Sequence, residues 1–273
     1  VAMNFIQAKL SPIDTEGRAK LTDSEFLALK EHDLTVLITP YLVIAAIIAV
    51  MFLVILFARM PKNADQNHSI DFLPTLRRIF NIKHYREGVV AQFFYVGAQI
   101  MCWTFIIQYG THYFMLEGMD ERSAEVLSQQ FNIYAMIFFC CSRFICTFFL
   151  KYINPGKLLF VLASAAIIFV IGVIMLRNSY GVYCLVAISG CMSLMFPTIY
   201  GIALQGLGDD AKFGAAGLIM AILGGSVLPP LQASIIDMGT LMSVPAVNIS
   251  FVLPLICFIV VAIYGKRMGK KAE

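Results

Sequence analysis

The long apolar runs of this sequence contain no Asp or Glu near their middles. Charged residues make up only 14% of the 273 residues, whereas hydrophobic residues make up 59%. A soluble domain of this composition would have too little polar surface to cover itself. These absences exclude a soluble globular class, and they leave this stretch of sequence without a proton acceptor at membrane depth.

Patterns typical of metal sites, disulfide frameworks and catalytic centres are also missing. An intramembrane enzyme needs an Asp pair, a Ser with a base, or a His cluster at membrane depth, and none is visible. We therefore expect no enzymatic activity, no metal and no organic cofactor. All seven cysteines fall inside apolar runs, where they are typical of small packing residues: Cys102, Cys140, Cys141, Cys146, Cys184, Cys191 and Cys257.

Seven apolar runs are each long enough to cross a bilayer. A hydrocarbon core of about 30 Å needs roughly 20 helical residues at a rise of about 1.5 Å each. The sequence therefore predicts an all-α membrane protein with seven transmembrane helices. The runs are Thr35–Met60, Val89–Phe114, Leu127–Leu150, Leu158–Leu176, Val182–Leu204, Phe213–Ile236 and Asn248–Tyr264.

The distribution of basic residues predicts the orientation of these helices. Lys and Arg collect in the 61–88 connector, at 151–157, at Lys212 and in the tail 266–273, while the opposite side receives only Arg122 and Arg177 outside residues 1–34. By the positive-inside rule, the connector and the tail face the cytoplasm and residues 1–34 form an extracytoplasmic loop. The same rule explains the basic stretch Phe72–Arg86, which we expect on the anionic inner leaflet and not on nucleic acid.

The start of the sequence is unusual for a complete membrane protein. Val1 is not Met, and the first 30 residues contain no signal peptide. We expect that a preceding helix is missing. Thr22 and Glu25 have the spacing of a capping box, which favours a short surface helix, although an ordinary disordered tail fits equally well.

Polar side chains within the second run are candidates for ligand binding. Gln92, Gln99 and Trp103 lie seven and then four residues apart, so they share one helix face. Amides can hydrogen-bond sugar hydroxyls, and an aromatic ring can pack against the C–H face of a pyranose. The alternative is that the amides join neighbouring helices and the Trp is a packing residue.

Arg143 and two groups of helix breakers are candidates for coupling and gating. Arg143 is the only basic residue deep within a run, so it either extends to the cytoplasmic boundary or faces a cavity and pairs with a carboxylate. The fifth run contains Pro197, and the sixth contains Gly224 and Gly225. Bends at Pro and close approach at Gly suit a rocking transporter, but they also suit any tightly packed membrane protein.

One motif is specific enough to suggest a family. The stretch Ala91–Trp103, with Gln92, Tyr95, Gly97, Gln99 and Trp103, resembles the first helix of the C-terminal half in the L-fucose permease (fucose–galactose–glucose:proton symporter) family of the major facilitator superfamily. The resemblance continues in order along nearly the whole chain. It is carried by Thr39–Tyr41, Ser142–Phe144, Met192–Ser193, Phe196–Tyr200, Gly206–Asp209, Lys212–Phe213 and Gly224–Gly225.

This resemblance implies a partial major facilitator fold. Residues 35–60 would be the last helix of the N-terminal bundle, 61–88 the cytoplasmic linker and 89–265 the six-helix C-terminal bundle. In the family, sugar binds between the two bundles, and the protonatable carboxylates lie on early helices of the N-terminal bundle, which are not in this sequence.

By the same resemblance, the implied function is proton-coupled import of L-fucose or a related hexose across the bacterial inner membrane by alternating access. The partners would be a hexose, the lipid bilayer and the absent N-terminal bundle, with the proton as the coupling ion. The implied sugar-binding residues are Gln92, Gln99, Trp103, Phe196 and Tyr200, and the implied coupling and gating residues are Arg143, Pro197, Gly224 and Gly225.

Two departures from the family pattern leave the sugar open. Phe196 replaces a Tyr of the L-fucose permease pattern, and Ser142 replaces a Gly. Glucose, galactose or another small polar solute is the alternative substrate. A seven-helix receptor would share the number of spans, but it would not explain the internal position of the long connector.

Overall fold

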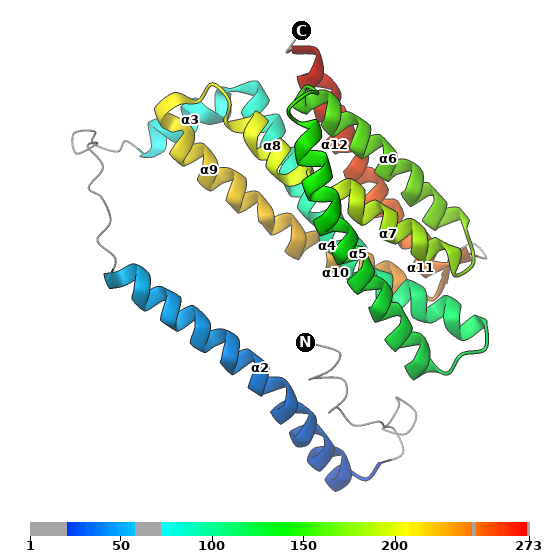
Figure 1. The fold of residues 1–273 in the computed structure, drawn as a ribbon. Coiled ribbons are helices and arrows are strands. Elements are labelled where there is room, and N and C mark those ends of the chain that lie inside the picture. Colours follow the sequence, from blue (N-terminus) through cyan, green and yellow to red (C-terminus); the bar gives the residue numbers. More distant parts are fainter. Residues whose placement is uncertain (1–20, 58–71, 242–243, 272–273) are drawn as a thin grey trace. The chain divides into compact units, whose positions relative to one another are not determined.

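The structure is a computed structural model that describes residues 21–57, 72–241 and 244–271. The chain divides into two units, residues 1–70 and 71–273, which are described separately below. The first unit contains helix α2, Asp23–Phe57 (Figure 1). The second contains the remaining helices and a two-stranded hairpin.

Helix α2 begins where the sequence predicts a cap. The backbone N–H of Thr22 donates to Glu25 Oε2 at 3.1 Å, and Thr22 Oγ1 donates to the same atom at 2.7 Å. The helix then continues without interruption to Phe57, so the short surface helix that the sequence predicts near Thr22 and Glu25 is the start of one long helix that includes the first apolar run. A capped start followed by residues free of Gly and Pro lets the helix extend through this polar stretch. Predictions for residues 1–20 and 58–71 lie outside the described residues.

The second unit is a bundle of helices connected by short turns. Its helices are α3 (Phe72–Asn81), α4 (Lys83–Leu116), α5 (Glu121–Phe149), α6 (Pro155–Met175), α7 (Tyr180–Met192), α8 (Met195–Leu204), η2 (Gly208–Asp210), α9 (Ala211–Met220), η3 (Ala221–Leu223), α10 (Gly224–Ile236), α11 (Ala246–Ser250) and α12 (Val252–Lys271). Strands β1 (Thr240–Leu241) and β2 (Val244–Pro245) pair antiparallel before α11.

The predicted number of spans is confirmed. Within the described residues, seven helical segments are long and apolar enough to cross a membrane, one in the first unit and six in the second. Several begin or end beyond the predicted apolar runs because polar caps extend them. Asp120, for example, accepts a hydrogen bond from the backbone N–H of Ser123 at 3.0 Å and starts α5 before its apolar residues begin.

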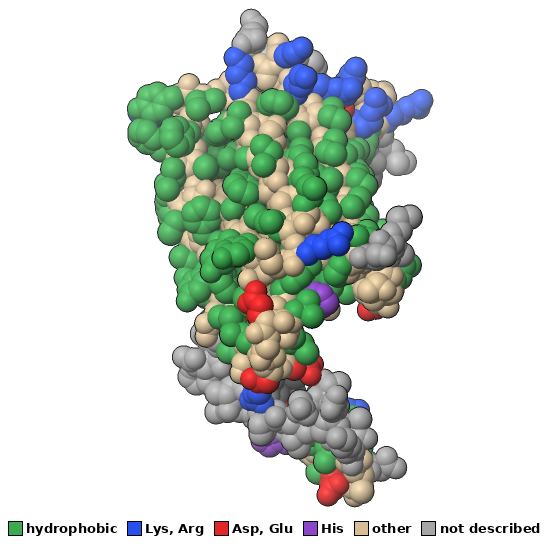
Figure 2. Space-filling view, turned by 90° about the vertical axis from the view of Figure 1, so that its right-hand side faces the viewer, with side chains coloured by type: hydrophobic (Ala, Val, Ile, Leu, Met, Phe, Trp, Pro, Cys, Tyr) green, Lys and Arg blue, Asp and Glu red, His purple; other side chains and the backbone are tan. Residues whose placement is uncertain are grey.

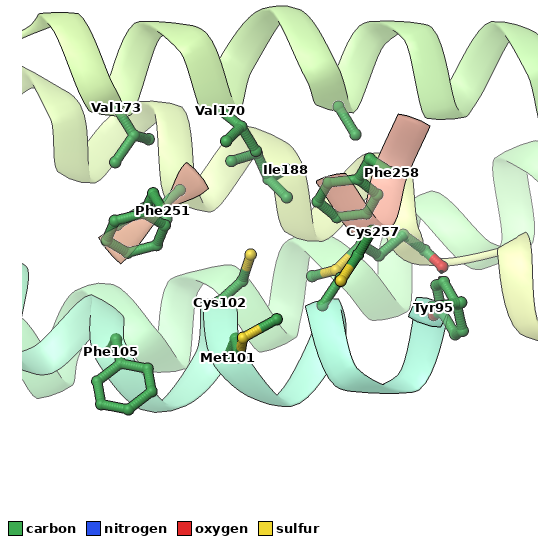
Figure 3. Close-up of a cluster of buried hydrophobic side chains, with 14 of the residues drawn as sticks. Tyr95, Met101, Cys102, Phe105, Val170, Val173, Ile188, Phe251, Cys257 and Phe258 are labelled. Carbon is green, nitrogen blue, oxygen red and sulfur yellow. Dashed lines mark hydrogen bonds between the residues drawn. The ribbon is translucent and has the colours of Figure 1, made fainter. Parts of the chain in front are cut away.

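Helix α4 is the structural centre of the second unit. It packs against α5, α7, α8, α10 and α12, and α6 packs along α12. Figure 3 shows Tyr95, Met101 and Phe105 of α4 in the buried cluster, together with Ile188 of α7 and Phe258 of α12. The side chains lining one face of α4 are therefore positioned from several sides at once.

Two spans of the second unit are interrupted. α7 and α8 form one span that breaks at Ser193–Leu194, and Pro197 lies in the first turn of α8. Proline is tolerated there because the first turn of a helix does not use its N–H groups internally. In the next span, the 3₁₀ turn η3 separates α9 from α10, directly before Gly224. The breaks thus occur next to the predicted Pro and Gly positions.

One end of the second unit is strongly basic. Figure 2 shows Lys and Arg side chains gathered at this end and hydrophobic side chains covering the surface below it. Here Arg78 of α3 forms a bidentate ion pair with Asp210 of η2, at 2.6 and 2.8 Å, and Arg267 of α12 pairs with Glu87 of α4 at 2.8 Å. The hydrogen bonds that Arg78 donates to the Asp210 carboxylate raise the pKa of the Arg78 guanidinium. These pairs connect α3 and α12 to the rest of the bundle.

Candidate functional site

The candidate site lies along one face of α4. Tyr95, Gln99 and Trp103 are four residues apart, so they form a row on that face. Tyr95 is fully buried, and its hydroxyl donates to the carbonyl of Met192 in α7 at 2.8 Å. Gln99 and Trp103 are half-buried. The Gln99 amide forms no hydrogen bond with another described residue, so its donor and acceptor atoms are available to a ligand.

Trp103 is held in place by two neighbouring helices. Its Nε1 donates to Ser189 Oγ of α7 at 3.2 Å, and the Phe139 ring of α5 packs against the indole edge to face, with centroids 5.1 Å apart. Because the indole N–H is used within the protein, a ligand would meet the aromatic ring of Trp103 and not its N–H.

Arg143 lies beside this pair of aromatic side chains. Its guanidinium carbon is 5.7 Å from the centre of the Phe139 ring. The side chain is exposed, and no carboxylate pairs with it among the residues that the structure describes. A cation above an aromatic ring is stabilised by the ring quadrupole even without a counterion.

The predicted residues of α8 join the same group through Tyr95. The ring of Phe196 contacts Tyr95 with centroids 6.3 Å apart, and it stacks on Tyr200 with an interplanar angle of 11°. Both α8 side chains are half-buried. We refer to Trp103, Phe139, Arg143, Tyr95, Phe196 and Tyr200 as the aromatic cluster.

Gln92 does not share the environment of Gln99 and Trp103. It is completely buried, and neither its Nε2 nor its Oε1 has a hydrogen-bond partner among the described residues. The seven-residue spacing places it near the same helix direction, but packing around the first half of α4 encloses it. The structure therefore brings Gln99, Trp103, Phe196, Tyr200 and Arg143 into one region and leaves Gln92 inside the bundle.

The predicted gating glycines lie at a helix contact. A Cβ atom on Gly224 would collide with the backbone carbonyl of Phe93, and one on Gly225 would lie 3.0 Å from Ile100 Cγ1. These residues let α10 approach the backbone of α4. Pro197 lies in the first turn of α8, next to Phe196.

Two contributors to the site carry no clear sequence signal. Phe139 is one of many aromatic residues in α5, and nothing in its spacing marks it as the neighbour of Trp103. Ser189 is one of several small residues in α7, and only the three-dimensional contact identifies it as the acceptor for the indole. No cluster of metal-ligating side chains occurs in the part of the chain that the structure describes.

Sequence comparison relates the chain to sugar transporters. No family model matches it. It is 46% identical to an L-fucose-proton symporter of Haemophilus influenzae over 92% of this chain and 57% of that protein. It is 30% identical to the Escherichia coli L-fucose-proton symporter over 91% of this chain and 55% of that protein. A glucose/galactose transporter of Brucella abortus is 28% identical over 85% of this chain and 53% of that protein. The chain thus spans little more than half the length of these relatives.

Structural comparison agrees with the sequence. The crystal structure of the major facilitator superfamily transporter FucP in the outward conformation superposes with a TM-score of 0.73 at 27% identity, over 98% of this chain and 64% of that one. The predicted partial major facilitator fold is therefore confirmed. By sequence and by fold, the chain belongs to the L-fucose-proton symporter family of the major facilitator superfamily.

Proposed function

We propose that this chain supplies one wall of the sugar site in a proton-coupled hexose symporter that works by alternating access. The observation that carries the proposal is the row on α4, where the free amide of Gln99 lies one turn from the half-exposed ring of Trp103. A pyranose can bind such a wall by donating and accepting hydrogen bonds at the amide and by placing its C–H face on the indole. The similarity to L-fucose-proton symporters supports this interpretation.

Gln99 and Trp103 are the sugar-contacting residues in this proposal, with Phe196 and Tyr200 extending the same wall. Gln92 contributes to it only if the bundle rearranges, because its amide is enclosed. The exposed guanidinium of Arg143 beside the wall is suited to orienting a sugar hydroxyl or to pairing with a carboxylate supplied from outside the described residues.

Coupling to protons requires a titratable group at membrane depth. The apolar runs of this sequence have no Asp or Glu near their middles. We therefore propose that the coupling carboxylates, and the opposite wall of the site, correspond to the part of the relatives that this chain does not match. The proton is the coupling ion, and no organic cofactor takes part.

The proposed location is the bacterial inner membrane, with the basic end of the second unit in the cytoplasm. That end includes Lys83, Lys151, Lys157, Lys212 and Lys266, and the positive-inside rule assigns such an end to the cytoplasmic side. The C-terminus then lies in the cytoplasm as well. Cysteine labelling from either side of sealed vesicles, with single cysteines introduced in a cysteine-free background, tests this orientation.

Uptake into proteoliposomes tests the function. The protein as its gene encodes it should accumulate labelled L-fucose when the external pH is lower than the internal pH, and accumulation should stop when the gradient is collapsed. A panel of hexoses includes glucose and galactose, because the Brucella relative is a glucose/galactose transporter and Phe196 departs from the L-fucose permease pattern. Equal uptake of all sugars with and without the gradient would contradict symport.

A further inference from the structure

Helix α7 ends at the break before α8, and its last carbonyl groups accept hydrogen bonds from other helices. An α-helix leaves its last four carbonyls without partners of its own. The carbonyl of Met192 accepts from the Tyr95 hydroxyl of α4 at 2.8 Å. The carbonyl of Gly190 accepts from the Ser142 hydroxyl of α5 at 2.9 Å. Two helices of the candidate site are thus attached to the end of α7.

The hydrogen bond of Ser142 differs from those of two other helical serines in this chain. Ser128 of α5 and Ser164 of α6 each donate to the carbonyl four residues earlier in their own helix, at 2.7 Å. This is a common local bond for a hydroxyl within a helix. Ser142 instead donates across to α7, and its Oγ accepts from the buried Ser193 Oγ at 3.3 Å. The single proton of the Ser142 hydroxyl is therefore used within the protein and not on a sugar.

Helices α5 and α7 approach each other closely at Gly190. Figure 1 shows the two helices side by side. A Cβ atom on Gly190 would collide with the ring of Phe138 in α5, so this ring packs directly on the glycine. Ser142 follows Phe138 by one turn of α5 and binds the carbonyl of the same glycine. These two contacts, one turn apart, fix where α5 lies along α7.

The contact at Gly190 also connects the two side chains that hold Trp103. Ser189, the residue before Gly190 in α7, accepts the indole N–H at 3.2 Å. Phe139, three residues before Ser142 in α5, packs edge to face on the indole with centroids 5.1 Å apart. Residues three apart are neighbours on the surface of a helix. The point at which Ser142 binds α7 therefore determines how closely Phe139 approaches Trp103.

We propose that Ser142 is a positioning residue for the sugar site: its hydroxyl fixes α5 on α7, and this places the Phe139 ring against Trp103. The inference rests on the proposed function, in which the sugar contacts the Trp103 ring. Ser142 acts through Phe139 and not by touching the ligand. Without the Ser142 hydroxyl, the Gly190 carbonyl still accepts from the backbone N–H of Ser193 at 3.3 Å, so the end of α7 keeps a donor and the protein should fold.

Fluorescence of Trp103 tests this positioning in the absence of sugar. Trp103 is the one tryptophan of the sequence, and subtracting the emission of Trp103→Phe in each background isolates its signal in the protein as its gene encodes it. Ser142→Ala should shift the emission to longer wavelength and increase quenching by acrylamide, because Phe139 covers the indole less closely. Ser164→Ala is the matched control, since it removes a half-buried hydroxyl bonded within α6, and it should change neither quantity. Unchanged fluorescence in Ser142→Ala would overturn the proposal.

A double-mutant cycle with Phe139→Leu tests whether Ser142 acts through the Phe139 ring. Ser142→Ala alone should weaken equilibrium sugar binding by about three- to tenfold, the effect of one hydrogen bond, and Ser164→Ala should not weaken it. In the Phe139→Leu background, Ser142→Ala should cause a further loss of less than about twofold, because the ring that it positions is absent. Equal losses in the two backgrounds would show that Ser142 acts independently of Phe139, which would overturn the proposal. Thermal unfolding of each variant separates a positioning defect from a folding defect.

Failure of this inference and failure of the proposed function give different results. Normal sugar binding by Trp103→Ala would overturn the proposed function, and the role of Ser142 in sugar binding with it, even if Ser142→Ala altered the fluorescence. Weak sugar binding by Trp103→Ala, together with wild-type affinity and fluorescence in Ser142→Ala, would leave the function in place and overturn only the role of Ser142.

Discussion

Trp103 donates its indole N–H to the hydroxyl of Ser189 at 3.2 Å, which connects α4 to α7 at the candidate sugar site. This bond fixes the plane of the indole, and the Phe139 ring contacts it from α5. The ring is therefore presented in one orientation before any ligand arrives. Such pre-organisation lowers the entropy cost of binding.

Trp103→Ala should weaken sugar binding by about tenfold or more, because stacking on an aromatic ring contributes roughly 1 kcal/mol beyond the burial of its area. Equilibrium binding of the transported hexose to the purified protein as its gene encodes it measures the loss. Thermal unfolding separates a binding defect from a folding defect.

Ser189→Ala is the matched control for that substitution. It removes the acceptor of the indole N–H but keeps the ring and its contact with Phe139. Affinity should fall only slightly. A large loss in Ser189→Ala together with unchanged affinity in Trp103→Ala would contradict the assignment of the indole as the sugar platform.

Gln92→Leu should stabilise the protein by about 1 kcal/mol or more. Both polar atoms of Gln92 are buried without partners among the described residues, and an apolar side chain of similar size avoids this desolvation cost. Thermal and denaturant unfolding of the purified protein provide the comparison. Gln92→Ala serves as the control, because it removes the same amide but leaves a cavity and should be less stable than Gln92→Leu. Destabilisation by Gln92→Leu would show that an unseen partner, such as a buried water, satisfies the amide.

Sequence patterns were sufficient for the spans but not for the side chains that face a ligand. The length of each span is dictated by bilayer thickness, so the apolar runs located all seven. Helix ends were less predictable. The cap at Thr22 was predicted, but not that α2 continues from it into the first apolar run, and the cap at Asp120 starts α5 in polar sequence ahead of its apolar run. The spacing of Gln92, Gln99 and Trp103 correctly predicted that the three side chains leave α4 in a similar direction. It could not predict that Gln92 is buried while the other two are half-buried, because that depends on which neighbouring helix covers each turn of α4.

Arg143 illustrates the same limit. The sequence left two options, extension to the membrane boundary or pairing with a carboxylate in a cavity. The structure has the guanidinium over Phe139, beside Trp103, and this contact depends on the rotation of α5 against α4. No property of the local sequence of α5 determines that rotation.

Gly224→Ala should destabilise the second unit by about 1–3 kcal/mol, because the new methyl group would collide with the backbone carbonyl of Phe93 and a backbone atom cannot rotate away. Gly201→Ala is the control. A Cβ atom on Gly201, in α8, meets nothing within 4 Å, so this substitution should leave the melting temperature unchanged or raise it slightly. Equal melting temperatures for the two variants would show that α10 can move away from α4 without cost.

Tyr113→Phe tests the polar contact at the opposite end of α4 from the basic residues. The Tyr113 hydroxyl donates to Asn248 Oδ1 at 2.6 Å, and Asn248 Nδ2 donates in turn to the carbonyls of Val173 at 2.9 Å and Leu176 at 3.1 Å. Loss of the hydroxyl leaves the buried Asn248 oxygen without this donor, and we expect a loss of about 0.5–2 kcal/mol in stability.

Tyr183→Phe is the control, because Tyr183 is exposed and its hydroxyl forms no hydrogen bond with another described residue. A melting temperature lowered only in Tyr113→Phe would confirm that this bond holds α4 to α6 through α11. Identical melting temperatures would mean that Asn248 contributes through its bonds to α6 alone.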